Sequence, residues 1–219
     1  MLKFIFMVIS LSFVISESDK NLYLLNILKE DKDWILIDNR FDSIQVYEKN
    51  IMGMQLNALK LDKIVNLSPE SIINVITNIN NYSNVMLNDD MVSFNLGEID
   101  NVMYGYNHFS IPLPFISDRH YFFKLYKESD KMLSWTLLPM HEVEKNVNFK
   151  RVFDRYPDAV YLDYGAGIWR LYSISDNITK VSYSLYMDSG GDLSNYLNDF
   201  FNSQSIITLF KGVLKEASK

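Results

Sequence analysis

The sequence contains no cysteine, and this absence removes several chemistries before any motif is considered. Disulfide frameworks, thiolate metal sites, cysteine nucleophiles and a lipid anchor on an N-terminal cysteine are all excluded. Histidine is scarce, since His108, His120 and His141 stand alone at no spacing typical of a metal site. There is no Gly-x-Ser-x-Gly nucleophile motif and no phosphate-binding glycine loop. We therefore expect no metal, no cofactor and no standard catalytic motif.

The chain also lacks an excess of positive charge. It has 21 Lys and Arg against 27 Asp and Glu, and its formal net charge is -6. Nucleic-acid binding depends on clustered basic side chains that neutralise phosphates, so we expect no nucleic-acid partner. With 48% hydrophobic and 22% charged residues, the composition is that of a globular chain with enough apolar material for one sizeable core.

Only the N-terminus carries a long apolar run. Lys3 precedes an apolar stretch over 4–15, which small and polar residues follow. This pattern predicts a secretory signal peptide over residues 1–16, cleaved after Ser16, because the run is short for a membrane span. An uncleaved anchor or a buried first helix is the alternative. Residues 17–219 then form the mature domain, which we expect to be secreted or periplasmic.

The first part of the mature chain indicates one helix followed by a strand. Residues 21–29 have the spacing of a short amphipathic helix, with Leu22, Leu25 and Leu28 on one side. Residues 43–50 alternate as a strand does. We found no internal repeat and no Gly/Pro-rich linker, so one domain is the simplest organisation.

A second strand and a second helix come next. Residues 52–65 predict a strand that Gly53 would curve or bulge. Ser68 is a good N-cap, and Pro69 suits the first helical position. The helix is expected to end near Asn81.

The middle of the chain is rich in strands separated by short turns. Such connections favour antiparallel pairing, because parallel strands need long crossovers. The order of strands and helices therefore predicts an α+β fold. The predicted strands cover 92–99, 101–111, 120–129, 131–140, 159–175 and 178–188.

A long C-terminal helix completes the pattern. Its apolar residues recur at helical spacing, and a stripe this broad must lie across an apolar surface, which we expect to be the concave face of the sheet. The stripe consists of Leu193, Tyr196, Leu197, Phe200, Phe201, Ile206, Ile207, Phe210, Val213 and Leu214.

Four segments together resemble one known family. "VSYSLYMDSGGDLSNYLNDFF" over 181–201 looks like the closing segment of START (steroidogenic acute regulatory protein-related lipid transfer) domains. "ISDRHYFFKLY" over 116–126 resembles the family's Ser-x-Arg-Asp strand opening, although His120 replaces the aspartate. "GIWRLYSIS" and "LSPESIINVITNINNYSNV" resemble its penultimate strand and first internal helix. The resemblance spans 21–219 and implies a helix-grip fold, in which a curved antiparallel sheet wraps a long C-terminal helix around a cavity for a lipid.

The candidate site residues are those expected to face this cavity. Ligand pockets are mostly apolar with a few placed polar groups, and tyrosine supplies both. For each residue the alternative is a place in a well-packed core, and for Arg119 an outward orientation, because an inward arginine is costly unless it is paired or meets a headgroup. The candidates are Tyr104, Tyr106, His108, Arg119, Trp169, Tyr183, Leu185, Phe200, Phe201, Ile207 and Phe210.

Three functions remain open from the sequence alone. The first is an exported protein that binds or transfers a lipid or other hydrophobic ligand and is not an enzyme. The second is an enzyme resembling polyketide cyclases and aromatases, for which His108 with Tyr104 or Tyr106 is the nominated acid–base group. A third is a collapsed cavity in a domain that binds other proteins.

The segment between the strands predicted over 101–111 and 120–129 is a candidate for transient membrane contact. It combines apolar residues with Pro112 and Pro114, which stop it from continuing as a central strand. An apolar loop of this kind can touch a membrane during ligand delivery, and charging Phe115 should then slow transfer between vesicles. The alternative is a loop buried against the sheet edge.

Overall fold

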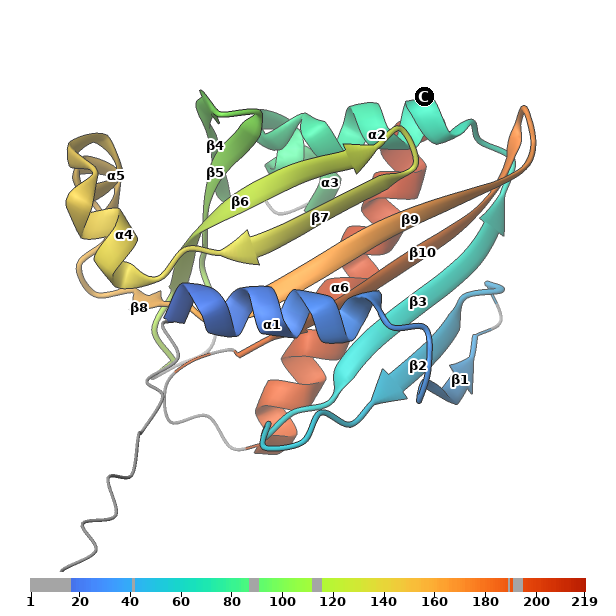
Figure 1. Cartoon of the computed structure of the whole chain (residues 1–219), viewed down its shortest axis with the longest axis horizontal. Helices are drawn as coiled ribbons and strands as arrows, with labels where there is room; N and C mark the ends of the chain where they lie inside the picture. Colours follow the sequence, from blue (N-terminus) through green and yellow to red (C-terminus); the bar gives the residue numbers. More distant parts are fainter. Residues whose placement is uncertain (1–16, 41, 87–90, 112–115, 189, 191–194) are drawn as a thin grey trace, which may run out of the picture.

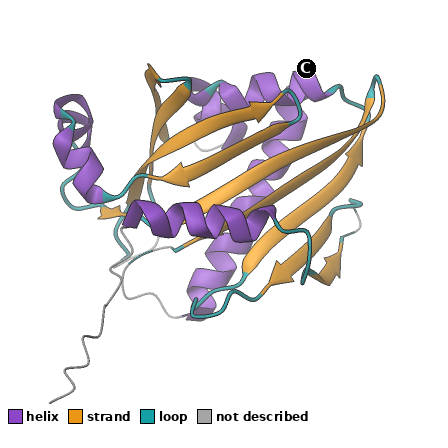
Figure 2. Ribbon diagram, in the orientation of Figure 1, coloured by secondary structure: helices purple, strands orange, loops and turns teal. Residues whose placement is uncertain are grey.

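One curved sheet with helices on both of its faces forms the body of the protein (Figure 1). The computed structural model describes residues 17–40, 42–86, 91–111, 116–188, 190 and 195–219, and it leaves out the side chains of 17–19 and 195–204. The predicted α+β class and the curved antiparallel sheet are both confirmed (Figure 2).

The sheet runs in the order β1-β2-β3-β10-β9-β7-β6-β5-β4, and β8 pairs with β6 off this path. All pairs along the path are antiparallel, and the last strand closes beside the third. The strands are β1 (Ile35–Asn39), β2 (Gln45–Lys49), β3 (Ala58–Val65), β4 (Val92–Ile99), β5 (Val102–Phe109), β6 (Arg119–Ser129), β7 (Met132–Leu137), β8 (Val160–Tyr161), β9 (Gly165–Ser175) and β10 (Ile178–Met187).

The helices divide between the two faces of the sheet. We call the face toward α6 the inner face and the face toward α1, α4 and α5 the outer face (Figure 1). The helices are α1 (Glu17–Lys29), α2 (Pro69–Thr77), the short η1 (Ile79–Asn81), α3 (Tyr82–Met86), α4 (Met140–Lys145), α5 (Val147–Phe153) and α6 (Asn195–Ala217).

Strand alternation sends successive side chains to opposite cores. On β10, Val181 and Tyr183 point to the inner core, where they join α6 residues such as Phe210. Tyr186 points to the outer core that Leu24 of α1 also fills. The sheet is therefore covered on both sides. Its central strands are apolar on the inner face, whereas their outer face also buries polar side chains such as Ser134, Ser182 and Ser184.

The predicted start of α2 is confirmed. The Ser71 amide donates to Ser68 Oγ at 3.2 Å, and Pro69 occupies the first turn. Ile72 and Ile76 are buried against the inner core. The helix is shorter than predicted, because the chain passes through η1 and α3 before it reaches β4.

A close approach of two backbones sets the position of α6. A Cβ atom at Gly212 would lie 1.9 Å from the Val85 carbonyl oxygen, so only glycine lets α6 pack this closely on α3. This contact places the second half of α6 across the inner face, where the helix forms one wall of the site described below.

The N-terminal predictions need two corrections. The helix begins at Glu17. Leu25 and Leu28 are buried as predicted, but Leu22 is 46% exposed and Leu24 is buried in its place. The strand predicted from residue 52 begins at Ala58. Met52 is 94% exposed, and Gly53 has φ +81, so this stretch is a turn.

Four elements were not predicted: β1, α3, α4 and α5. β1 is a short edge strand whose residues are exposed, so no alternation marks it. The strand predicted over 159–175 is two strands, β8 and β9, that pair with different partners. No helix in the part of the chain that the structure describes is long and apolar enough to cross a membrane.

Candidate functional site

A cavity of about 290 Å³ lies between the inner face of the sheet and α6. Its walls come from β5, β6, β7, β9 and β10 on one side and from α2, α3 and α6 on the other. Most of the lining is apolar, and it includes Ile76, Met86, Met91, Phe109, Phe123, Leu125, Trp135, Leu162, Trp169, Leu185, Met187, Ile206, Leu209 and Val213. The volume is at the small end of the range for ligand pockets.

The rigid part of the wall is a stack of aromatic rings. The Trp169 and Tyr183 ring centroids are 3.9 Å apart and nearly parallel, and Phe210 of α6 lies 5.9 Å from Trp169 on a parallel plane. Beside the stack, Gly167 makes room for the Trp135 ring, because a Cβ atom there would lie 2.5 Å from it.

The cavity has one polar end. Asn107 is only 2% exposed, and its Nδ2 donates to the Tyr121 hydroxyl at 3.0 Å. The two residues face each other across β5 and β6. The Asn107 Oδ1 atom has no hydrogen-bond partner. A buried acceptor of this kind is uncommon and calls for an explanation.

Arg119 lies beside this polar end and is 3% exposed. Its guanidinium donates to the carbonyl of Ser117 and, at 3.2 Å, to that of Gly190. Burial lowers the pKa of Arg119, and the Asp118 carboxylate opposes this shift. The arginine thus ties the start of β6 to the segment that follows β10, on the rim of the cavity.

The hydroxyl groups that border the cavity stay protonated at physiological pH. Burial raises the pKa of Tyr82, Tyr121 and Tyr183. Among the lining residues that the structure describes there is no carboxylate and no imidazole. The described lining can therefore hold and orient a molecule, but it presents no group suited to act as a general base near pH 7.

Four of the predicted site residues line the cavity: Arg119, Trp169, Tyr183 and Leu185. Of the two orientations left open for Arg119, the structure has the inward one. Ile207 and Phe210 are buried in the same inner core, where Phe210 supports the aromatic stack from behind. The side chains of Phe200 and Phe201 lie outside the described residues.

Tyr104, Tyr106 and His108 need a correction, because they do not line the cavity. They project from the outer face of β5 toward α4 and α5 and toward the segment after α5. The sequence shows two alternating sets in this strand, and the bulkier set was assigned to the wrong face. The set that faces inward contains Gly105 and Asn107 and therefore looked less like a ligand wall.

The site residues that sequence analysis missed are Asn107 and Tyr121. Part of the signal is in the sequence, since Arg119 and Tyr121 are two residues apart and so share a strand face. Asn107 could not be added from the sequence, because its pairing with Tyr121 depends on the register of β5 against β6.

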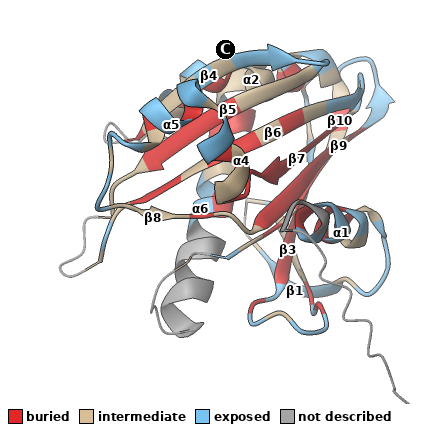
Figure 3. Ribbon diagram, turned by 60° about the vertical axis from the view of Figure 1, so that its left-hand side comes forward, coloured by how far each residue is buried: buried red, intermediate tan, exposed pale blue. Residues whose placement is uncertain are grey.

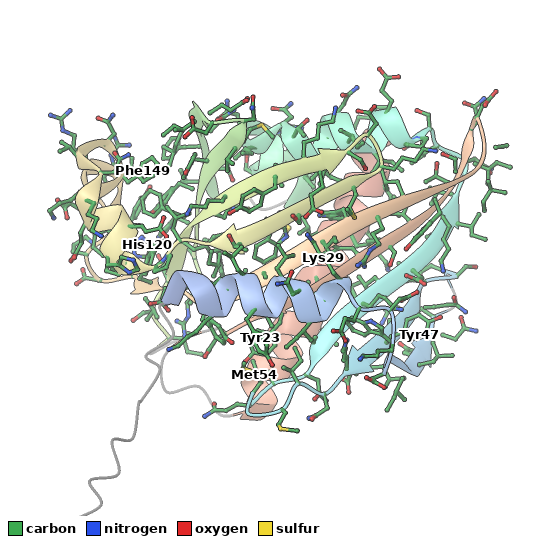
Figure 4. The ribbon with its side chains drawn as sticks, viewed as in Figure 1. Tyr23, Lys29, Tyr47, Met54, His120 and Phe149 are labelled. Carbon is green, nitrogen blue, oxygen red and sulfur yellow. The ribbon has the colours of Figure 1, made fainter. Side chains whose placement is uncertain are left out.

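The outer face beneath α4 and α5 is a closed aromatic cluster (Figure 4 shows His120 and Phe149 on this side). The His120 Nδ1 atom is 3.1 Å from the Tyr106 hydroxyl, and the His108 ring stacks on Tyr156 at 3.9 Å. Burial lowers the pKa of His120 to about 4. Burial also lowers the pKa of His108, although Asp118, 3.4 Å away, favours its charged form.

No protein-family model and no curated protein sequence matches the chain. Solved structures do. A STAR-related lipid transfer protein from Xanthomonas axonopodis has a TM-score of 0.65 at 19% identity and covers 86% of this chain and 100% of its own. Human StAR-related lipid transfer protein 5 has a TM-score of 0.64 at 12% identity, with 92% and 94% coverage.

A third similar structure is the Zhui aromatase/cyclase from Streptomyces sp. R1128, with a TM-score of 0.51 at 10% identity and 74% and 93% coverage. At these identities the likeness concerns the fold. The chain has the START-like helix-grip fold that its sequence resemblance implied.

Proposed function

We propose that this protein binds a lipid or a similar hydrophobic molecule in the cavity between its sheet and α6, and that it carries this ligand between sites. The observation that carries the proposal is the cavity itself, about 290 Å³ in volume and lined mainly by apolar side chains. An apolar surface of this kind is unfavourable in contact with water and favourable in contact with an alkyl chain.

The energy available from the lining is sufficient without specific chemistry. Each methylene removed from water contributes about 0.8 kcal/mol, so a chain of modest length offsets the cost of association. The names of two similar structures describe lipid transfer proteins, which supports the same use of the fold here.

We prefer binding to catalysis for this cavity. The similarity to an aromatase/cyclase shows that the fold also occurs in an enzyme. The acid–base group nominated from the sequence, His108 with Tyr104 or Tyr106, lies on the outer face of the sheet, away from the cavity. The described lining residues contain no carboxylate or imidazole that could replace it.

Export and membrane contact are two further parts of the proposal. Both rest on the sequence, since residues 1–16 and 112–115 lie outside the described part of the chain. Ser110 and Ile111 line the cavity immediately before the second of these segments, which supports ligand entry at this point. The N-terminal residue of the protein recovered from the medium or periplasm tests export. Vesicle-to-vesicle transfer by a Phe115→Glu variant tests membrane contact.

The first experiment is native mass spectrometry of the purified protein, combined with lipid extraction. We expect a co-purifying apolar molecule at near-stoichiometric amount. Leu185→Trp places a larger side chain in the cavity and should abolish this adduct, whereas Tyr172→Trp adds the same ring to an exposed site on β9 and should leave it unchanged. The proposal would be contradicted if the protein carried no co-purifying ligand and also failed to bind fluorescent fatty acids and sterols.

A further inference from the structure

The polar end of the cavity has a hydrogen-bonding pattern that points to one kind of ligand group. Asn107 and Tyr121 meet across β5 and β6 through a single hydrogen bond, from Asn107 Nδ2 to the Tyr121 oxygen. Both residues line the cavity, and Asn107 is 2% exposed. The pair is thus a polar site built into an apolar wall.

Two hydrogen-bonding positions of this pair are unused within the described residues. Asn107 Oδ1 has no partner. The Tyr121 oxygen accepts from the amide, so the hydroxyl proton remains available for donation. The pair therefore has at least one unpaired acceptor and one unpaired donor.

This conclusion holds for either orientation of the amide. If the amide is rotated by half a turn, Tyr121 donates to Oδ1, and the unused groups become an amide N–H and a lone pair of the Tyr121 oxygen. The pair again has at least one unpaired donor and one unpaired acceptor. Burial raises the pKa of Tyr121, so its hydroxyl keeps its proton in both arrangements.

We propose that this Asn107–Tyr121 pair recognises a hydroxyl group, and that the ligand of the cavity is an apolar molecule with a neutral alcohol at its polar end. This inference rests on the proposed function. A hydroxyl both donates and accepts, so it completes the pair. A carboxylate, a phosphate diester or an ether can only accept and leaves one protein group unpaired. A quaternary ammonium group does neither.

The neighbouring arginine does not require an anionic ligand. The Arg119 guanidinium already donates to the carbonyls of Ser117 and Gly190. These bonds account for a buried cation at the rim without a headgroup as its partner. An ionised ligand group would in addition lose its hydration inside an otherwise apolar cavity, which is a large cost.

The test compares three probes that differ only at the polar end: ω-bromododecanol, ω-bromododecanoate and ω-bromododecyl methyl ether. Bromine quenches indole fluorescence on contact, and Trp135 and Trp169 both line the cavity. We expect the alcohol to bind the intact protein about tenfold more tightly than the ether or the carboxylate, because only the alcohol leaves no buried group unpaired.

Two variants locate the preference. Asn107→Leu and Tyr121→Phe should each reduce the ratio of alcohol to ether affinity to about twofold or less, while the ether itself binds as before. Tyr121→Phe removes a single oxygen atom and so tests the idea even if Asn107→Leu folds poorly. Tyr172→Phe is the matched control, since it removes the same oxygen atom from an exposed site on β9 and should keep the tenfold ratio.

The outcomes distinguish a failure of the hydroxyl site from a failure of the proposed ligand-binding function. If the three probes quench equally well, or if the ratio survives in both variants, the hydroxyl site is wrong while the hydrophobic cavity stands. If a carboxylate or phosphate ligand co-purifies and binds best, the hydroxyl site is also wrong. If no probe quenches any tryptophan, the proposed function itself fails.

Discussion

The two faces of β5 and β6 carry similar aromatic residues and serve different purposes. On the inner face, Tyr121 and Phe123 border a cavity. On the outer face, Tyr106 and Phe122 lie 4.8 Å apart, and Phe122 packs on Phe149 of α5, so that α4 and α5 close the surface (Figure 3). An alternating strand therefore becomes a binding wall or a solid core according to the element that covers it.

The largest expected difference between the faces is in their tolerance of lost volume. Phe122→Ala should lower the free energy of unfolding by about 4 kcal/mol, because it opens a new void in a packed cluster. Leu185→Ala should lower it by about 2 kcal/mol, because this side chain already borders empty space. Urea denaturation of both variants measures the two losses. Equal losses would mean that the inner face is packed as tightly as the outer one.

The next largest difference is in the response to acid, because His120 on the outer face makes the free energy of unfolding depend on pH. The folded-state pKa of His120 is about 4, lowered from an ordinary value of 6.5, so below pH 6.5 the unfolded chain binds a proton that the folded protein excludes. The folded state therefore has its full stability from this site above pH 6.5. The free energy of unfolding falls by about 3 kcal/mol as the pH drops from 6.5 to 4.

The measurement is the urea midpoint as a function of pH. His120→Gln should flatten the profile between pH 6.5 and 4, whatever its effect on stability at pH 7. Asp42 and Glu128, whose pKa values are lowered by Lys211 and Lys29, add their own losses below their ordinary pKa values in both proteins. An unchanged slope in the variant would show that His120 is not the source.

A change in the helix contact should affect the inner face alone. Gly212→Ala places a methyl group against the Val85 carbonyl, which forces α6 away from α3 at a cost of about 2 kcal/mol. The same shift should weaken ligand binding, because α6 is a wall of the cavity. Thr208→Ala on the exposed side of α6 is the control. Thermal unfolding and ligand titration that match the native protein would argue against the tight α3–α6 contact.

A substitution at the N-cap of α2, which lies outside both faces of β5 and β6, should change the free energy of unfolding least. Ser68→Ala removes the N-cap of α2 and should lower the free energy of unfolding by about 1 kcal/mol. Ligand affinity should remain the same, since Ser68 does not line the cavity. Ser68→Asp keeps a capping oxygen and should restore the stability. A change in affinity would link the cap to the cavity.

Local signals account for the parts of the fold that were predicted. The cap at Ser68 and the described half of the α6 stripe, from Ile206 to Leu214, each depend on neighbouring residues, and both are present as expected. The exposed edge strand β1 and the short helices α4 and α5 were missed, because short elements carry few repeats of any period.

By itself, the sequence determined the α+β order of elements, the long apolar helix at the end and the absence of thiol chemistry. Only the tertiary structure decided which side of each strand faces α6. Alternation defines two sets of residues but not which of them is inward, because both sets of β5 are compatible with a buried strand. The pairing of Asn107 with Tyr121 and the packing of α4 and α5 over Tyr106 break this symmetry, and both are contacts between distant parts of the chain.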